Sequence, residues 1–185
     1  MKSQIRVLGI DDGFHEKTQQ EVLVIGAVYR GADYLDGLIS TKITKDADDS
    51  TKKLIEFINN SKYQSQIRAI FLNGITLGGF NIVDIKELSN QTKIPVITII
   101  RNKPDLEKIK QTLIKLNMRN KVPLIEKAGN IIKAGEIYIQ TAGCSFEQAT
   151  QLLKLTCVHS NIPEALRAAH LIATGVVLGE SRGKA

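Results

Sequence analysis

The stretch EVLVIGAVYRGADYLDGLISTKIT (residues 21–44), with IRVLGIDD (residues 5–12) before it, decides the fold of this chain. Three apolar runs rich in β-branched residues follow one another here, at residues 5–12, 21–31 and 34–44, and such runs are typical of strands. Only short breaks separate them, and strands joined by short turns pair antiparallel. Residues 5–44 therefore predict a three-stranded antiparallel meander.

The rest of the chain alternates between strand and helix patterns. A strand reached through a helix normally runs parallel to the strand before it, with a right-handed crossover. We therefore expect one α/β domain over residues 1–185, in which the meander and the parallel strands form a mixed sheet with helices on both faces. A ribonuclease H-like architecture has this order of elements, as do several other folds. Beyond the meander, the predicted helices span residues 49–58, 81–92, 104–116, 145–158 and 163–174, and the predicted strands span 67–72, 95–100 and 136–142. No element is predicted for residues 117–133.

The composition excludes several classes of protein. Apolar residues make up 43% of the 185 residues and charged residues 24%, which excludes disorder and collagen-like repeats. No uncharged stretch approaches the roughly 20 residues that a membrane span needs. The N-terminus runs straight into a strand pattern without a visible signal peptide, and Cys144 and Cys157 match neither a disulfide framework nor a zinc site. These features predict a cytoplasmic protein.

The positive charge of the chain is concentrated in one segment. Residues 101–133 carry nine Lys or Arg against three Asp or Glu, which accounts for the whole net charge of +6. A local basic block on an otherwise neutral chain predicts an anionic partner such as DNA, although a merely solvated lysine-rich surface is the alternative. The candidate nucleic-acid contacts are Arg101, Lys103, Lys108, Lys110 and Lys115.

Two adjacent aspartates end the first predicted strand, in the sequence Gly9-Ile10-Asp11-Asp12-Gly13. A carboxylate at the end of an apolar strand is costly unless it is solvated, paired or bound to metal. Strand alternation places Asp11 on the face of Gly9 and Asp12 on the opposite face. Gly9 would then leave room for a ligand beside Asp11, while the alternative role for either aspartate is to cap the following turn.

Further carboxylates follow the third and fourth predicted strands. Asp46 lies where it could share a sheet edge with Asp11, whereas an aspartate just before the 49–58 helix is equally an N-cap. Converging carboxylates bind Mg²⁺, and such sites support phosphodiester cleavage. The candidate catalytic residues are therefore Asp11, Asp12, Asp46, Asp49 and Asp84.

A glycine-rich segment spans residues 73–81 and precedes the predicted helix that holds Asp84. Its glycines would let the backbone approach a phosphate near a helix N-terminus, but its spacing matches neither a P-loop nor a dinucleotide motif, and a tight loop explains it equally. The three histidines show no ligand spacing, and His170 is expected to be a partly buried structural residue.

Several motifs together resemble one known family. They are LGIDDG (8–13), YLDGLIST (34–41), NGITLGGFNIVD (73–84), RNKPDLE (101–107), IPEALRAAHLIATG (162–175) and GESRGKA (179–185). This combination resembles an archaeal family, first described as a domain of unknown function and also called endonuclease dU, over essentially the whole chain. That family is similar to endonuclease V, a Mg²⁺-dependent, ribonuclease H-like nuclease that acts at deaminated bases.

The resemblance to endonuclease V also shows where this chain departs from the relative. Gly9-Ile10-Asp11 is similar to the strand whose aspartate binds metal, Arg101 stands at the place of a basic strand-end residue, and residues 162–169 resemble the helix Leu-Pro-Glu-Pro-Thr-Arg-Leu-Ala-Asp. Asn73 stands where the relative has a second carboxylate, and Cys144 stands where it has a histidine. The Pro-Tyr-Ile-Pro-Gly wedge that separates strands in endonuclease V is missing from the sequence.

The resemblance implies a metal-dependent endonuclease for damaged DNA, with deaminated bases and uracil among the targets. It implies Mg²⁺ or Mn²⁺ as cofactor, with Asp11, Asp46 and Asn73 as the expected metal ligands, and DNA as the partner. Asn73 and Cys144 favour an alternative, a non-catalytic nucleic-acid-binding protein on the same fold. An enzyme that binds a phosphate-bearing ligand at the glycine-rich segment is a third possibility.

Overall fold

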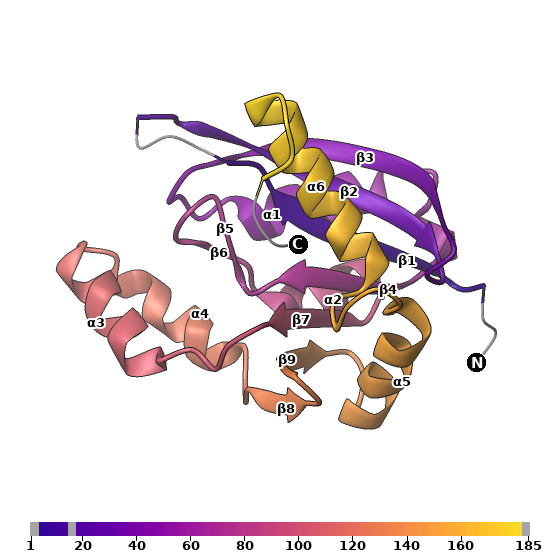
Figure 1. Ribbon diagram of the computed structural model, residues 1–185. Helices are drawn as coiled ribbons and strands as arrows, with labels where there is room; N and C mark the ends of the chain where they lie inside the picture. Colours follow the sequence, from indigo (N-terminus) through magenta and orange to yellow (C-terminus); the bar gives the residue numbers. More distant parts are fainter. Residues whose placement is uncertain (1–3, 15–17, 183–185) are drawn as a thin grey trace.

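A mixed seven-stranded sheet forms the centre of the protein, as the computed structural model shows for residues 4–14 and 18–182 (Figure 1). The strands lie in the order β3-β2-β1-β4-β7-β9-β8. Their bounds are β1 (Arg6–Asp12), β2 (Glu21–Arg30), β3 (Tyr34–Thr44), β4 (Ile67–Asn73), β7 (Val96–Ile100), β8 (Ile132–Ala134) and β9 (Ile137–Ala142).

The predicted meander and the first parallel strands are confirmed. β1 pairs antiparallel with β2, and β2 pairs antiparallel with β3. β4 runs parallel to β1 on its other side, and β7 runs parallel to β4. The carboxyl ends of β1, β4 and β7 therefore meet at one edge of the sheet.

The prediction that every later strand runs parallel is wrong for β9, which pairs antiparallel with β7. The connection between them contains α3 (Leu106–Lys115), the 3₁₀ turn η2 (Arg119–Lys121) and α4 (Val122–Lys127). These helices pack on each other and project from the end of β7 in Figure 1, instead of crossing a face of the sheet. Because the chain stays at the edge where β7 ends, the turn between β8 and β9 also lies at that edge, and β9 starts there and runs back opposite to β7.

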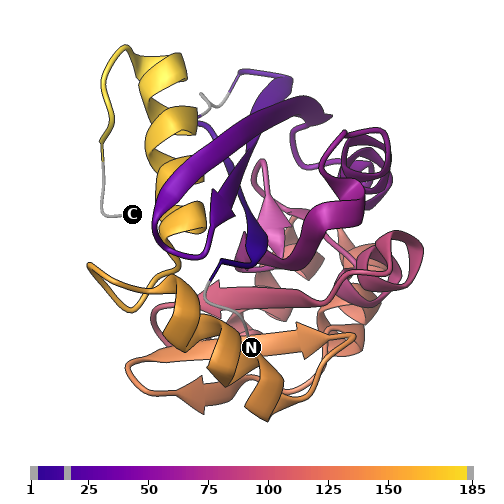
Figure 2. The same ribbon diagram turned by 90° about the vertical axis from the view of Figure 1, so that its right-hand side faces the viewer.

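Helices cover both faces of the sheet, as predicted (Figure 2). One core joins the side chains of Leu8 and Ile10 to helices α1 (Ser50–Asn59) and α2 (Ile85–Thr92). A second core joins Val7 to α5 (Phe146–Thr156) and α6 (Glu164–Leu178) on the other face. None of the helices in the described part of the chain is long and apolar enough to cross a membrane.

A small hairpin replaces the first part of the helix predicted at 81–92. Strands β5 (Thr76–Leu77) and β6 (Asn81–Ile82) pair antiparallel, and α2 begins only at Ile85. The reason is Asp84, whose side chain accepts a hydrogen bond from the backbone N–H of Glu87 and so acts as the N-cap. A short 3₁₀ turn, η1 (Gln64–Gln66), precedes β4.

Gly9 leaves room for a helix, not for a ligand as the sequence suggested. A Cβ atom on Gly9 would lie 2.2 Å from the carbonyl carbon of Ala165 and 2.3 Å from the backbone nitrogen of Leu166. Helix α6 therefore packs with its own backbone on β1. This close contact brings the rest of α6 over the end of the strand, where Asp11 lies.

Candidate active site

Asp11 and Asn73 meet at the carboxyl edge of the sheet because they end two neighbouring parallel strands, β1 and β4. The Asn73 side-chain nitrogen lies 3.3 Å from each carboxylate oxygen of Asp11 and donates to them. Asp11 is only 3% exposed. A buried carboxylate needs such partners, because burial without them is costly.

His170 completes this cluster from helix α6. Its Nδ1 lies 2.9 Å from Oδ2 of Asp11, and its Nε2 lies 3.3 Å from the backbone oxygen of Arg182. The hydrogen bond that His170 donates to Asp11 raises the pKa of His170 above its usual range, against the opposing effects of burial and of the nearby Arg101 charge. An imidazole with an acceptor at each nitrogen is favoured in its protonated form.

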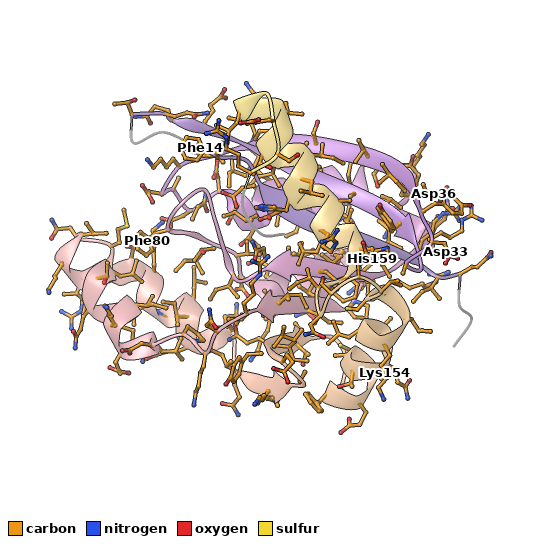
Figure 3. The ribbon with its side chains drawn as sticks, viewed as in Figure 1. Phe14, Asp33, Asp36, Phe80, Lys154 and His159 are labelled. Atoms are coloured by element: carbon orange, nitrogen blue, oxygen red, sulfur yellow. The ribbon has the colours of Figure 1, made fainter. Side chains whose placement is uncertain are left out.

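The cluster forms the floor of an open cleft of about 640 Å³. An aromatic side chain, Phe14, stands at its rim on the segment after β1 and is 51% exposed (Figure 3). The cleft is therefore accessible to a large ligand. Its lining consists of Asp11, Asp12, Gly13, Phe14, Asn73, His170, Thr174, Leu178 and Arg182.

His170 and Arg182 are the members of this site that the residue patterns missed. His170 was expected to be structural because it has no ligand spacing with the other histidines. The resemblance held a usable signal: residue 170 follows the 162–169 match at the place where the endonuclease V helix has its final aspartate. Arg182 belongs to the quoted GESRGKA tail, which by itself has no recognisable chemistry.

Asp12 and Asp46 bind the glycine-rich segment instead of joining Asp11. Asp12 points to the opposite face, as alternation predicts, and its Oδ2 accepts from the Gly78 amide at 3.0 Å. Asp46 accepts from the Phe80 amide at 2.7 Å. Carboxylates thus already occupy these two amides, so the segment does not present them to a phosphate.

Asp49 and Asp84 hold loops and helices together. Asp49 accepts from the backbone and hydroxyl of Thr44 and from the Asn81 side chain at 2.6 Å. Burial would raise the pKa of Asp49, but these hydrogen bonds outweigh it and lower the pKa. Asp84 caps α2 and pairs with Lys127, and the hydrogen bond that Lys127 donates to Asp84 raises the pKa of Lys127. Within the described residues, no three His, Cys, Asp or Glu side chains are arranged to hold one metal ion.

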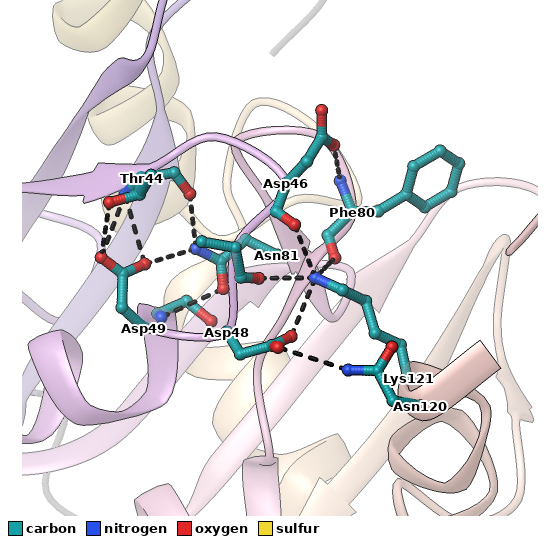
Figure 4. A network of polar contacts seen from close by, with 10 residues as sticks. Thr44, Asp46, Asp48, Asp49, Phe80, Asn81, Asn120 and Lys121 are labelled. Atoms are coloured by element: carbon teal, nitrogen blue, oxygen red, sulfur yellow. Dashed lines mark hydrogen bonds and ion pairs between the residues drawn. The ribbon is translucent and has the colours of Figure 1, made fainter. Parts of the chain in front are cut away.

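Part of the basic block has a structural role, which Figure 4 shows for Lys121. This buried ammonium donates to the backbone oxygens of Asp46 (2.8 Å), Ala47 (2.6 Å) and Phe80 (2.9 Å) and pairs with Asp48 at 2.9 Å. It thereby fastens η2 to the loop after β3 and to the β5–β6 hairpin.

The exposed remainder of the basic block is smaller than its composition suggests. Lys110 pairs with Glu107 and Glu126, and its hydrogen bonds to these two carboxylates raise the pKa of Lys110. Arg101, Lys103, Lys108 and Lys115 are exposed. Of these, Arg101 lies within electrostatic reach of His170, at the end of the strand next to β4. The block thus begins beside the cleft and continues along α3.

Comparison with known proteins places the chain among archaeal relatives. The Endonuclease dU family profile matches residues 3–177. A UPF0215 protein of Methanothermobacter thermautotrophicus is 46% identical over 191 residues, which cover 100% of this chain and 94% of that protein. The crystal structure of a protein of unknown function from Archaeoglobus fulgidus has a TM-score of 0.88 at 42% identity, over 94% of this chain and 98% of that one.

A more distant likeness concerns the fold alone. The structure of Ciona intestinalis endonuclease V, in complex with a 24mer DNA containing an inosine followed by a ribo-adenosine, has a TM-score of 0.62 at 15% identity. The match covers 95% of this chain and 87% of that one. The sheet is therefore the ribonuclease H-like sheet of endonuclease V, as the resemblance implied. The chain itself belongs to the Endonuclease dU family.

Proposed function

We propose that this protein is an endonuclease that cleaves DNA at a deaminated base, with Asp11, Asn73 and His170 at its catalytic centre. The observation that carries the proposal is the buried Asp11 carboxylate, held by both partners at the floor of an open cleft. The family name and the inosine-containing DNA bound by the Ciona relative support this class of substrate.

A divalent cation fits these residues as a cofactor. A Mg²⁺ site needs only one or two carboxylates and completes its shell with water and substrate phosphate. Asp11 and the side-chain oxygen of Asn73 would hold the ion, which when bound would activate water and offset charge on the scissile phosphate. Asp46, the third expected ligand, is engaged by the Phe80 amide and does not join them.

His170 is suited to act as a general acid. Asp11 orients its ring through Nδ1, and the hydrogen bond to Asp11 raises the pKa of His170 above its usual range. Its Nε2 contacts the backbone oxygen of Arg182, a residue that lines the cleft. A protonated His170 can therefore give its Nε2 proton to the leaving oxygen once that oxygen takes the place of the Arg182 carbonyl.

A second, smaller cavity lies next to the cluster and is suited to an extruded base. Its volume is about 150 Å³, and it begins at Gly74, the residue after Asn73. Enzymes that act on a base in duplex DNA receive it in a pocket with apolar walls and a few polar groups. The lining fits that description: Gly74, Ile75, Thr76, Ile100, Pro104, Leu106, Ile109, Ile125, Ile131 and Gln140.

A cleavage panel tests the proposal. The substrates are labelled duplexes and single strands that contain uracil, hypoxanthine or no lesion, incubated with Mg²⁺, Mn²⁺ or EDTA. We expect lesion-dependent nicking with a metal, and its loss in Asp11→Asn and His170→Ala. Asp33→Asn is the matched control, because Asp33 is an exposed aspartate on the distant β2–β3 turn (Figure 3).

One observation favours a second function, the binding of damaged DNA without cleavage. Asp11 is the single carboxylate in contact with Asn73 among the described residues, whereas a second carboxylate would bind metal more strongly. This favours a protein that binds damaged DNA without cutting it. Tight lesion-dependent binding without nicking under any metal condition would support that function over the nuclease.

A further inference from the structure

The chain turns back onto the cleft after helix α6. The helix ends at Gly179, whose φ of 80° lets the chain reverse. The Ser181 hydroxyl then donates to the backbone oxygen of Leu171 at 2.7 Å. Gly175 makes room for this contact, since a Cβ atom there would lie 3.1 Å from the Ser181 hydroxyl oxygen. Residues 179–182 are therefore anchored along α6 and end at the cleft.

The backbone of this segment touches the catalytic cluster. The Arg182 carbonyl oxygen lies 3.3 Å from Nε2 of His170, opposite the Asp11 contact at Nδ1. The imidazole is thus held between a carboxylate and a backbone carbonyl. The placement of the Arg182 backbone in the structure consequently affects the orientation of the His170 ring.

Among the residues that the structure describes, the Arg182 side chain is bound to Glu180, a partner that a substrate phosphate can replace. Its guanidinium contacts Oε1 of Glu180 through Nη2 at 2.6 Å and through Nε at 2.8 Å, and the two side chains are 68% and 64% exposed. Exposed ion pairs contribute little stability. A guanidinium binds phosphate with the same two-pronged geometry that it uses for a carboxylate.

Arg182 brings a permanent positive charge to a cleft whose lining also includes carboxylates. Asp11 and Asp12 both line it, and Arg182 is the one Lys or Arg among its described lining residues. A DNA phosphate that lies close to these carboxylates is stabilised by a cation beside it. Arg182 is in place to supply that charge.

We propose that residues 179–182 form a phosphate-binding arm of the active site, a role that rests on the proposed nuclease function. In the free protein Glu180 occupies the guanidinium of Arg182. In the complex a phosphate of the DNA backbone replaces Glu180, while the Arg182 carbonyl orients His170 until the leaving oxygen takes its place at Nε2. Glu180 therefore weakens DNA binding, and Arg182 strengthens it.

Binding measurements on paired variants test this arm. The probe is a fluorescein-labelled uracil duplex in EDTA, titrated by anisotropy at several salt concentrations. Arg182→Ala should weaken binding and flatten the plot of log affinity against log salt by about one unit. Glu180→Gln should tighten binding, and the gain should vanish in the Glu180→Gln/Arg182→Ala double variant because the released guanidinium is then missing.

Matched controls separate this local effect from a change in net charge. Arg68→Ala removes an exposed arginine near the start of β4, far from Asn73 at its end, and Glu56→Gln removes an exposed carboxylate on α1. Both should leave binding nearly unchanged. If Arg182→Ala and Glu180→Gln behave like these controls, the arm does not exist. If the wild-type protein neither binds nor cleaves any duplex, the nuclease function itself fails.

Steady-state kinetics distinguish the two roles of Arg182. Arg182→Ala should raise KM. Arg182→Lys should raise it less, because lysine supplies the positive charge but not the two-pronged hydrogen bonding of the guanidinium. A chain that ends at Gly179 should lose kcat in addition, because His170 then lacks its carbonyl partner. Melting curves establish that each variant is folded. An unchanged kcat in the shortened, folded chain would overturn the backbone role.

Discussion

Gly9 of β1 lies directly beneath the backbone of Ala165 in α6, and this contact sets the distance from helix to strand where Asp11 and His170 meet. His170 lies five residues beyond Ala165, about 7.5 Å along a helix. Asp11 lies two residues beyond Gly9, about 6.6 Å along a strand. The two spacings nearly match, which is why His170 reaches the Asp11 carboxylate.

The first prediction concerns this contact. Gly9→Ala should push α6 away from the sheet, destabilising the fold by about 1–3 kcal/mol as overpacked cores do, and should reduce catalysis further by separating His170 from Asp11. Thermal melting and cleavage rates measure the two effects. Ala165→Gly should not rescue the variant, because the clash involves backbone atoms. Rescue by that second change would show that the side chain, not the backbone, sets the distance.

The second prediction restores a carboxylate beside Asp11. Asn73→Asp replaces a donor to Asp11 by a like charge, so without metal it should lower the melting temperature. With Mn²⁺ it should bind the ion more tightly than the wild type, as an added carboxylate favours a hard cation. Calorimetric titration checks both chains. Equal Mn²⁺ affinities would remove Asn73 from the metal site.

The third prediction concerns the exposed part of the basic block. Neutralising Lys103, Lys108 and Lys115 to Gln should weaken DNA binding equally for all sequences and flatten the salt dependence by up to about one unit per lost phosphate contact. Lys110→Gln should have a smaller effect, because Glu107 and Glu126 already neutralise it. A salt plot that the triple substitution leaves unchanged would exclude α3 from the interface.

The fourth prediction is a pH dependence of stability from Asp49. Its folded-state pKa is lowered, so it stabilises the fold above its unfolded pKa of about 3.9, and this contribution is lost as pH falls through the folded value. Asp49→Asn should lower the free energy of unfolding at neutral pH by about 1 kcal/mol and make its acid dependence shallower. Urea unfolding between neutral and acid pH measures this, with Asp33→Asn as control. Parallel pH profiles for wild type and Asp49→Asn would contradict it.

The parts of the fold that were predictable depend on local pattern. The meander follows from three apolar runs with short turns, since such strands have no other way to pair. The direction of β9 was not predictable, because it depends on α3 and α4 packing together beyond the sheet instead of crossing it.

The candidate site was predictable only where strand ends carry it. Asp11 and Asn73 meet because β1 and β4 are parallel neighbours, as in the ribonuclease H-like strand order that the family resemblance implies. The contribution of His170 depends on how closely α6 approaches Gly9. The hydrophobic periodicity of the sequence does not reveal this tertiary contact. Asp46 and Asp49 carry equally suitable carboxylates, but loop amides and side chains bind them.

Lys121 has a consequence for how this protein can change in evolution. Its ammonium binds backbone carbonyls, and every amino acid supplies one. The side chains of Ala47 and Phe80 are therefore free to drift without removing an acceptor. The lysine has no such freedom, because its loss would remove the donor that these three partly buried carbonyls share. Descendants of this chain should therefore vary at residues 47 and 80 and keep the lysine at residue 121.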